Sequence, residues 1–208
     1  MWSKGAAIRP VPRFAVVERC TLDRVERELA DDTPPSRDEL DGAFTRFEAT
    51  QPHLSASISA VLARPLDETA LALGYFLSIA IWLAFERTFG ERRLREISAD
   101  VLKATEEAIT LEEELRAANG AEPLDLDDVV SLAQPHVLAF VHEHVDAALD
   151  PACRSARAAD AGEPRDPPEI DVDDVHAVYR ATVLLTLCLS HAVVPLDGAS
   201  RGRDELMA

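Results

Sequence analysis

One short motif occurs twice and combines groups that could bind a ligand. Gln51-Pro52-His53 recurs 83 positions later as Gln134-Pro135-His136. Amide and imidazole side chains donate and accept hydrogen bonds, and a proline inside a helix deprives the carbonyl four residues upstream of its donor. Irregular backbone of this kind is found at many binding sites. We therefore expect a ligand site at these turns or, as the simpler alternative, polar side chains that satisfy the freed backbone.

Other polar side chains in apolar helical segments extend this candidate site. Ligand pockets are mostly apolar and carry a few convergent polar groups. Satisfied hydrogen bonds in the core are the simpler explanation of each such residue. The candidate ligand-binding residues are Glu48, Gln51, His53, Tyr75, Gln134, His136 and Tyr179.

The remaining histidines and the cysteines do not indicate a metal or a catalytic centre. His142 and His144 are two positions apart, and on a helix such side chains point about 200° apart. There is no Glu-x-x-His pair of the di-iron kind, no Gly-x-Ser-x-Gly and no His-Glu-x-x-His. The cysteines are three, with no Cys-x-x-Cys unit. We therefore predict no metal, no cofactor and no catalytic residue.

The repeated motif belongs to a longer internal similarity. At the offset of 83, apolar residues match apolar residues after each motif, as Leu54 matches Val137. Removing 21 residues around the segment 151–168 changes the offset to 104 and aligns Tyr75 with Tyr179. This pattern predicts duplication of a three-helix unit. Chance similarity between helices rich in Ala and Leu is the alternative.

The apolar periodicity predicts an all-α fold, a single compact bundle-like domain of about six helices in two related units. Thr21 could cap a first helix, and Ser36 with Glu39 forms a capping box for a second, which should kink or restart at Pro52. An apolar helix should end at Gly90. The expected helices cover about 21–30, 36–63, 67–89, 91–119, 124–149 and 171–193.

The helix expected over 91–119 has the clearest pattern. A narrow apolar stripe with spacings of 3 and 4 should pack against a neighbour, and the glutamates at 106, 107 and 112–114 should lie on solvated faces. The stripe consists of Leu94, Ile97, Val101, Ala104, Ala108, Leu111, Leu115 and Ala118.

The expected domain organisation places this bundle between two less regular ends. Residues 1–20 read as an extended arm with a β-like stretch at 14–17, and 196–208 as a disordered tail. The domain covers 21–195, with units of about 21–90 and 91–195. The proline-rich and charged segment 151–168 reads as a flexible insertion in the second unit.

The charge of the chain excludes one class of partner. A formal net charge of −17 opposes binding to nucleic acid, which needs basic residues that release counterions.

Two uncharged segments, residues 69–85 and 181–196, lack Asp, Glu, Lys and Arg. Both are shorter than the run of about 20 apolar residues that a membrane span requires. We expect both to be core helices, not membrane spans. The cysteine usage and the predominance of Arg over Lys favour a cytoplasmic, bacterial protein.

Taken as a function class, these features favour an acidic, non-enzymatic helical module for protein–protein interaction or assembly. Its partner would be a second copy or another protein, and the acidic charge of the chain favours a basic one as the other protein. The competing hypothesis is a small-molecule-binding protein or enzyme whose site lies in the helical core near the two Gln-Pro-His turns.

Overall fold

The computed structural model describes residues 8–30, 34–118, 134–150 and 171–196, and within them the protein is all-α, as predicted. A single 3-10 turn, Arg13–Ala15, precedes the first α-helix, and no strand occurs in the described ranges. The α-helices are α1 (Arg19–Leu29), α2 (Pro34–Thr50), α3 (Pro52–Leu62), α4 (Glu68–Phe89), α5 (Ala99–Ala118), α7 (Pro135–Leu149) and α9 (Val172–Ala192).

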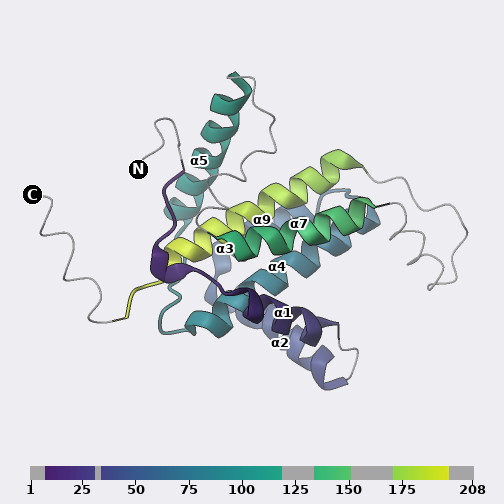
Figure 1. The fold of residues 1–208 in the computed structure, drawn as a ribbon, viewed down its shortest axis with the longest axis vertical. Coiled ribbons are helices and arrows are strands. Elements are labelled where there is room, and N and C mark those ends of the chain that lie inside the picture. Colours follow the sequence, from purple (N-terminus) through teal and green to yellow (C-terminus); the bar gives the residue numbers. More distant parts are fainter. Residues whose placement is uncertain (1–7, 31–33, 119–133, 151–170, 197–208) are drawn as a thin grey trace, which may run out of the picture.

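Helices α4 and α9 form the centre of the core, because they contain the two long runs without charged residues. They pack against each other along most of their length (Figure 1). At Gly74 the backbone of α4 comes so close to its neighbours that an added Cβ would lie 2.4 Å from Cδ2 of Leu62. In the described part of the chain, α4 alone is long and apolar enough for a membrane span, and 67% of its most apolar window is buried.

The first turns of α4 and α9 are tied to each other by aspartates. Asp67 caps α4, its side chain accepting from the N–H of Ala70 at 2.8 Å. The other carboxylate oxygen of Asp67 accepts from the N–H of Asp171, the residue that caps α9. In return, the carboxylate of Asp174 accepts from the N–H of Asp67 at 2.8 Å. These bonds satisfy N–H groups at helix N-termini that have no partner within the helix.

The outer helices surround this pair in a balanced arrangement. Helix α1 packs on α4 and α7, and α5 packs on α9 and α3. Helix α3 also contacts α9, just as α7 contacts α4. The contacts among these six helices are therefore unchanged when α1, α3 and α4 are exchanged for α5, α7 and α9. The contacts of α2 with α1, α3 and α4 have no counterpart in the described part of the chain. The duplication itself stays a prediction, and this arrangement is what such a duplication would produce.

The helix expected from residue 91 begins only at Ala99, so that prediction was wrong by two turns. Residues 91–98 instead form a turn and an extended linker. The N–H of Arg95 donates to the carbonyl of Ala192, and that of Val194 donates to the carbonyl of Arg93. This short antiparallel pairing uses the backbone groups that a helix would need, so the linker cannot be helical. The expected helix end at 119–120 lies outside the described residues.

Smaller boundary predictions had mixed outcomes. The restart at Pro52 is confirmed, since α2 ends at Thr50 and Pro52 is the first residue of α3. Helix α2 begins at Pro34, two residues before the expected capping residue Ser36. The β-like stretch at 14–17 is extended only after the 3-10 turn. The segments 124–133, 151–168 and 197–208 lie outside the described residues.

Candidate functional sites

The two glutamines of the repeated motif have the same backbone conformation. Gln51 has φ −135° and ψ 58°, and Gln134 has φ −135° and ψ 62°. Each is the residue before a proline that starts a helix, a position from which α-helical backbone is sterically disfavoured. Both side chains are buried, at 1% and 0% exposed. The proline therefore turns each glutamine side chain inward at the start of its helix.

Each buried amide holds an extended segment of backbone. Oε1 of Gln51 accepts from the N–H of Ile97 at 3.0 Å, and Nε2 donates to the carbonyl of Arg95 at 2.9 Å. Oε1 of Gln134 accepts from the N–H of Val17 at 3.1 Å, and Nε2 donates to the carbonyl of Ala15 at 2.6 Å. In both cases the two backbone groups are two residues apart. We call these two arrangements the glutamine clamps.

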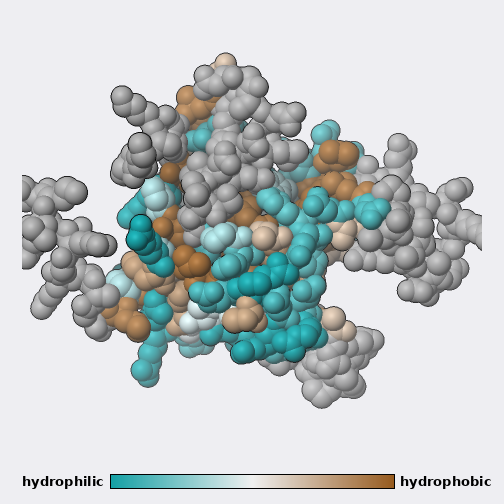
Figure 2. Space-filling view, in the orientation of Figure 1, coloured by the Kyte–Doolittle hydropathy of each residue, from teal (hydrophilic) through white to brown (hydrophobic). Residues whose placement is uncertain are grey.

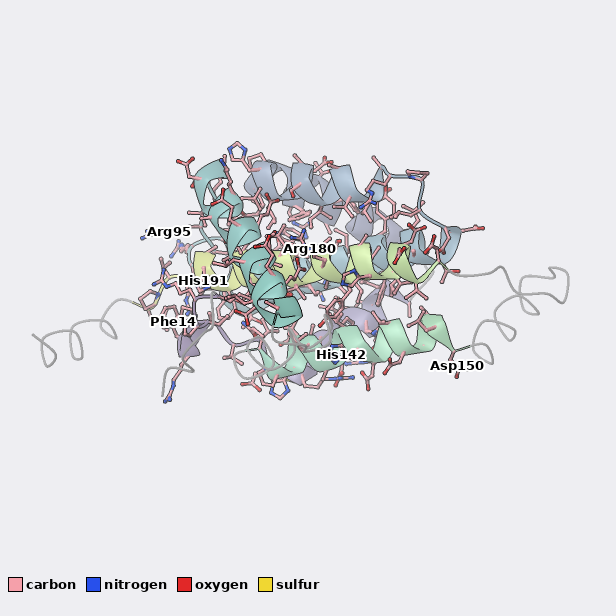
Figure 3. The ribbon with its side chains drawn as sticks, turned by 90° about the horizontal axis from the view of Figure 1, so that it is seen from above. Phe14, Arg95, His142, Asp150, Arg180 and His191 are labelled. Atoms are coloured by element: carbon pink, nitrogen blue, oxygen red, sulfur yellow. The ribbon has the colours of Figure 1, made fainter. Side chains whose placement is uncertain are left out.

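The clamps cross between the predicted units. Gln51 of the first unit holds the linker that precedes α5, and Gln134 of the second unit holds the arm that precedes α1. Figure 3 shows Phe14, Arg95 and His191 gathered at the same end of the molecule. The clamps use both the oxygen and the nitrogen of each amide on the protein itself, so a ligand that displaced either amide would have to break a buried bond.

The histidines of the motif do not share this inward position. His53 is exposed, and His136 is partly exposed with Nε2 3.8 Å from the carboxylate of Glu18. Among the described residues, no hydrogen bond or ion pair joins one Gln-Pro-His turn to the other. The structure therefore gives no contact that would make the two turns one site.

The remaining predicted site residues lie in different surroundings. Glu48 is exposed on α2. Tyr75 and Tyr179 are each the eighth residue of their helix, yet Tyr75 is exposed beside Phe44 and Tyr179 is buried. The hydroxyl of Tyr179 lies 3.3 Å from Nε2 of His142, and the two rings stack.

His142 and His144 face different neighbours, as their spacing predicted. His142 lies between α7 and α9 beside Tyr179 (Figure 3). His144 packs on the ring of Phe76 of α4, and its Nε2 lies 3.2 Å from the carboxylate of Glu26 of α1. No cluster of three potential metal ligands occurs in the part of the chain that the structure describes.

A cavity of about 290 Å³ opens beside the first clamp. Its wall comes from the end of α2, the C-terminal half of α4 and the linker before α5. The lining residues are Ala49, Thr50, Gln51, Trp82, Glu86, Glu91, Leu94 and Glu96. Only Gln51 of these was a sequence candidate. Trp82 lies inside an uncharged run that indicated a plain core helix, and the glutamates lay in a segment expected to be helical. The bend at Gly90, with φ 68°, brings that segment back over α4.

The orientation of α5 differs from the expected one, because the apolar stripe that should pack against a neighbour lies largely on the exposed face of this helix. Leu102, Ile109 and Glu112 are buried against the bundle. Val101 is 45% exposed and Leu111 48% exposed, and Ala104 and Ala118 are exposed as well. At 100° per residue, the stripe from Val101 to Ala118 points roughly 120° away from the buried face. The prediction that all of the glutamates are solvated was wrong for Glu112, which is 4% exposed.

Polar contacts hold the opposite face of α5 on the bundle. The guanidinium of Arg180 donates to the carboxylate of Glu113 at 2.9 Å and to the hydroxyl of Thr110 at 2.8 Å. Ser57 of α3 donates to the carboxylate of Glu106. Figure 3 shows α5 crossing α9 near Arg180, and in Figure 1 its C-terminal half projects beyond the other helices. In Figure 2 hydrophobic surface is visible at that projecting end.

Comparison with known proteins gives no relative: no family model, no curated protein and no solved structure matches the chain.

Proposed function

We propose that this protein is a helical interaction module that binds a basic amphipathic helix along the exposed face of α5. The observation that carries the proposal is the apolar stripe that α5 turns away from its own core, with Val101 and Leu111 about half exposed. Exposed apolar residues in a continuous row mark interaction sites, because a water-exposed row has no stabilising role in the monomer. The stripe has the 3-4 spacing that a second helix can pack into.

The charge beside the stripe favours a basic partner over a second copy. Asp100, Glu107 and Glu114 are spaced by seven, so they form one exposed row along the same flank of α5. Lys103 is the one basic residue between them, and it already pairs with Glu107 at 3.8 Å. A second copy of α5 would bring another row of carboxylates to the interface. A helix with Lys or Arg on its flanks would neutralise this row, and positions flanking the apolar seam set partner choice in helix pairs.

Binding of a synthetic probe tests this proposal. The probe is a three-heptad peptide with Leu at the seam and Lys at the flanks, and fluorescence anisotropy measures its affinity. Leu111→Asp should weaken binding by about tenfold or more, because it places a charge in the apolar contact. Val172→Asp is the matched control, since Val172 is also exposed, at 66%, but lies on α9.

Two further measurements decide whether a basic helix or a second copy of this chain binds to the exposed face of α5. Affinity for the Lys-flanked peptide should fall as salt is added, and the same peptide with Glu at its flanks should bind more weakly. Equal binding of a sequence-scrambled Lys peptide would show plain charge attraction and refute the docking face. A concentration-dependent dimer in light scattering that Leu111→Asp abolishes would refute the basic partner and assign the face to a second copy.

A further inference from the structure

The cavity beside the first clamp has the composition of a site for a small organic cation. Its inner wall includes Trp82 and Leu94, and its rim carries three carboxylates, those of Glu86, Glu91 and Glu96. Glu86 is neutralised by Arg46, whose guanidinium binds both carboxylate oxygens at 3.0 and 3.1 Å. Glu91 and Glu96 are exposed and form no ion pair with any residue that the structure describes. Two carboxylates of the cavity lining are therefore not engaged in an ion pair within the described part of the chain.

An independent feature is the indole of Trp82. The side chain is 1% exposed, and its Nε1 is the one buried side-chain nitrogen or oxygen among the described residues without a hydrogen-bond partner. An unsatisfied buried N–H destabilises a fold. Trp82 also lines the cavity, so an acceptor bound there would satisfy its N–H once the ring shifts. The guanidinium of Arg46 lies 5.7 Å from the centre of the ring. The surface around this indole thus already accommodates a cation.

The glutamine clamp positions the acidic rim. Glu96 lies between Arg95 and Ile97, whose backbone groups Gln51 holds at 2.9 and 3.0 Å. The same linker continues into α5, so the cavity and the start of that helix have a common anchor. Gln51 acts here as a positioning residue, since both its Oε1 and its Nε2 bind the linker.

We propose that this cavity binds a cation of amino-acid size that carries a guanidinium group together with a hydrogen-bond acceptor. The cation faces Glu91 and Glu96, and the acceptor takes the N–H of Trp82. A volume of about 290 Å³ lies at the small end of ligand pockets, which suits a molecule of this size. Because the indole is buried, the ligand must shift the ring or the guanidinium that covers it. The fluorescence of Trp82 should therefore change on binding.

Argininamide is the test probe, because it combines a guanidinium with a carboxamide oxygen. Agmatine keeps the guanidinium but lacks that oxygen, and citrullinamide keeps the oxygen but replaces the guanidinium by an uncharged group. Calorimetric titration and Trp82 fluorescence in a Trp2→Phe variant measure binding. We expect argininamide to bind with a dissociation constant of about 1 mM or less, which corresponds to ordinary ligand efficiency for so few atoms. Both other compounds should bind at least about threefold more weakly.

Variants separate the two parts of the site. Glu91→Gln with Glu96→Gln should weaken argininamide and agmatine alike. The matched pair Glu68→Gln with Glu143→Gln, two exposed glutamates outside both proposed sites, should leave both unchanged. Trp82→Phe should remove the advantage of argininamide over agmatine while circular dichroism shows the fold intact. Absence of argininamide binding at 10 mM, or equal affinity for citrullinamide, would overturn the proposal. Peptide binding to α5 is measured separately, so failure of one site leaves the other test intact.

Discussion

Replacing each clamp glutamine by methionine should destabilise the protein, and Gln134→Met should cost more than Gln51→Met. Methionine has nearly the same volume, so the change removes hydrogen bonds without opening a large cavity. Loss of the Gln134 amide leaves two buried backbone groups without a hydrogen-bond partner, the N–H of Val17 and the carbonyl of Ala15. Ser190 also loses a bond from Nε2, but its hydroxyl still donates to the carbonyl of Thr186.

The magnitudes follow from the number of groups left without a partner. Each buried group that loses its hydrogen-bond partner costs about 1–3 kcal/mol of stability. Because Gln134→Met leaves two such groups, it should lower the free energy of unfolding by about 2–5 kcal/mol. For Gln51, only the N–H of Ile97 is fully buried, because the bond to the carbonyl of Arg95 lies near solvent. Its loss should cost about 1–3 kcal/mol.

Urea unfolding measures these differences, and hydrogen exchange locates them. The amide of Val17 should lose protection in Gln134→Met, and the amide of Ile97 should lose it in Gln51→Met, each without a comparable change at the other clamp. His53→Ala is the control, since His53 is exposed beside the first clamp. A loss below about 0.5 kcal/mol in both variants, with unchanged exchange, would refute the role of the clamps.

Three other positions give independent predictions. Gly74→Ala should destabilise the fold by about 1–3 kcal/mol in thermal unfolding, because its Cβ would lie 2.4 Å from Leu62; an unchanged melting temperature would contradict that close approach. In variants that keep one cysteine each, Cys20 should react readily with a thiol reagent, and Cys188 should not until the protein unfolds, because burial raises the pKa of its thiol to about 12. Burial also lowers the pKa of His191 in the folded protein, so the unfolded chain binds the proton more readily, and stability should fall as pH decreases below about 6.5. His191→Gln should reduce that pH dependence in urea titrations, and an identical slope would contradict it.

The sequence predicted the helices whose signals are local. Helix α4 begins after the capping residue Asp67 and stops before Gly90, which has a positive φ. Helix α3 begins at Pro52, which has no backbone N–H to continue the preceding helix. The start of α5 could not be predicted this way. Leu94 and Ile97 fit the apolar spacing of the helix, but contacts from far away in the chain hold them in the linker.

The orientation of α5 and the position of the cavity depend on tertiary contacts too. Two apolar rows run along α5, and the row through Leu102 and Ile109 is buried because Arg180 and Ser57 fix the polar positions beside it. The glutamines were rightly singled out, but a pattern of residue types cannot show that their partners are backbone groups in other segments. No local signal marks Trp82 as part of a cavity wall, because its neighbours along α4 are core residues.

The crossed clamps also bear on the order in which the protein can mature during synthesis. The N–H of Val17 donates to the side chain of Gln134, which lies 117 residues further along the chain. At ribosomal rates of about 5–20 residues per second, that side chain is made roughly 6–23 s after Val17. Until then the arm has no partner for these backbone groups, although α1 can already pack on α4. The N–H of Val17 and the carbonyl of Ala15 must therefore remain in contact with water until the second half leaves the ribosome.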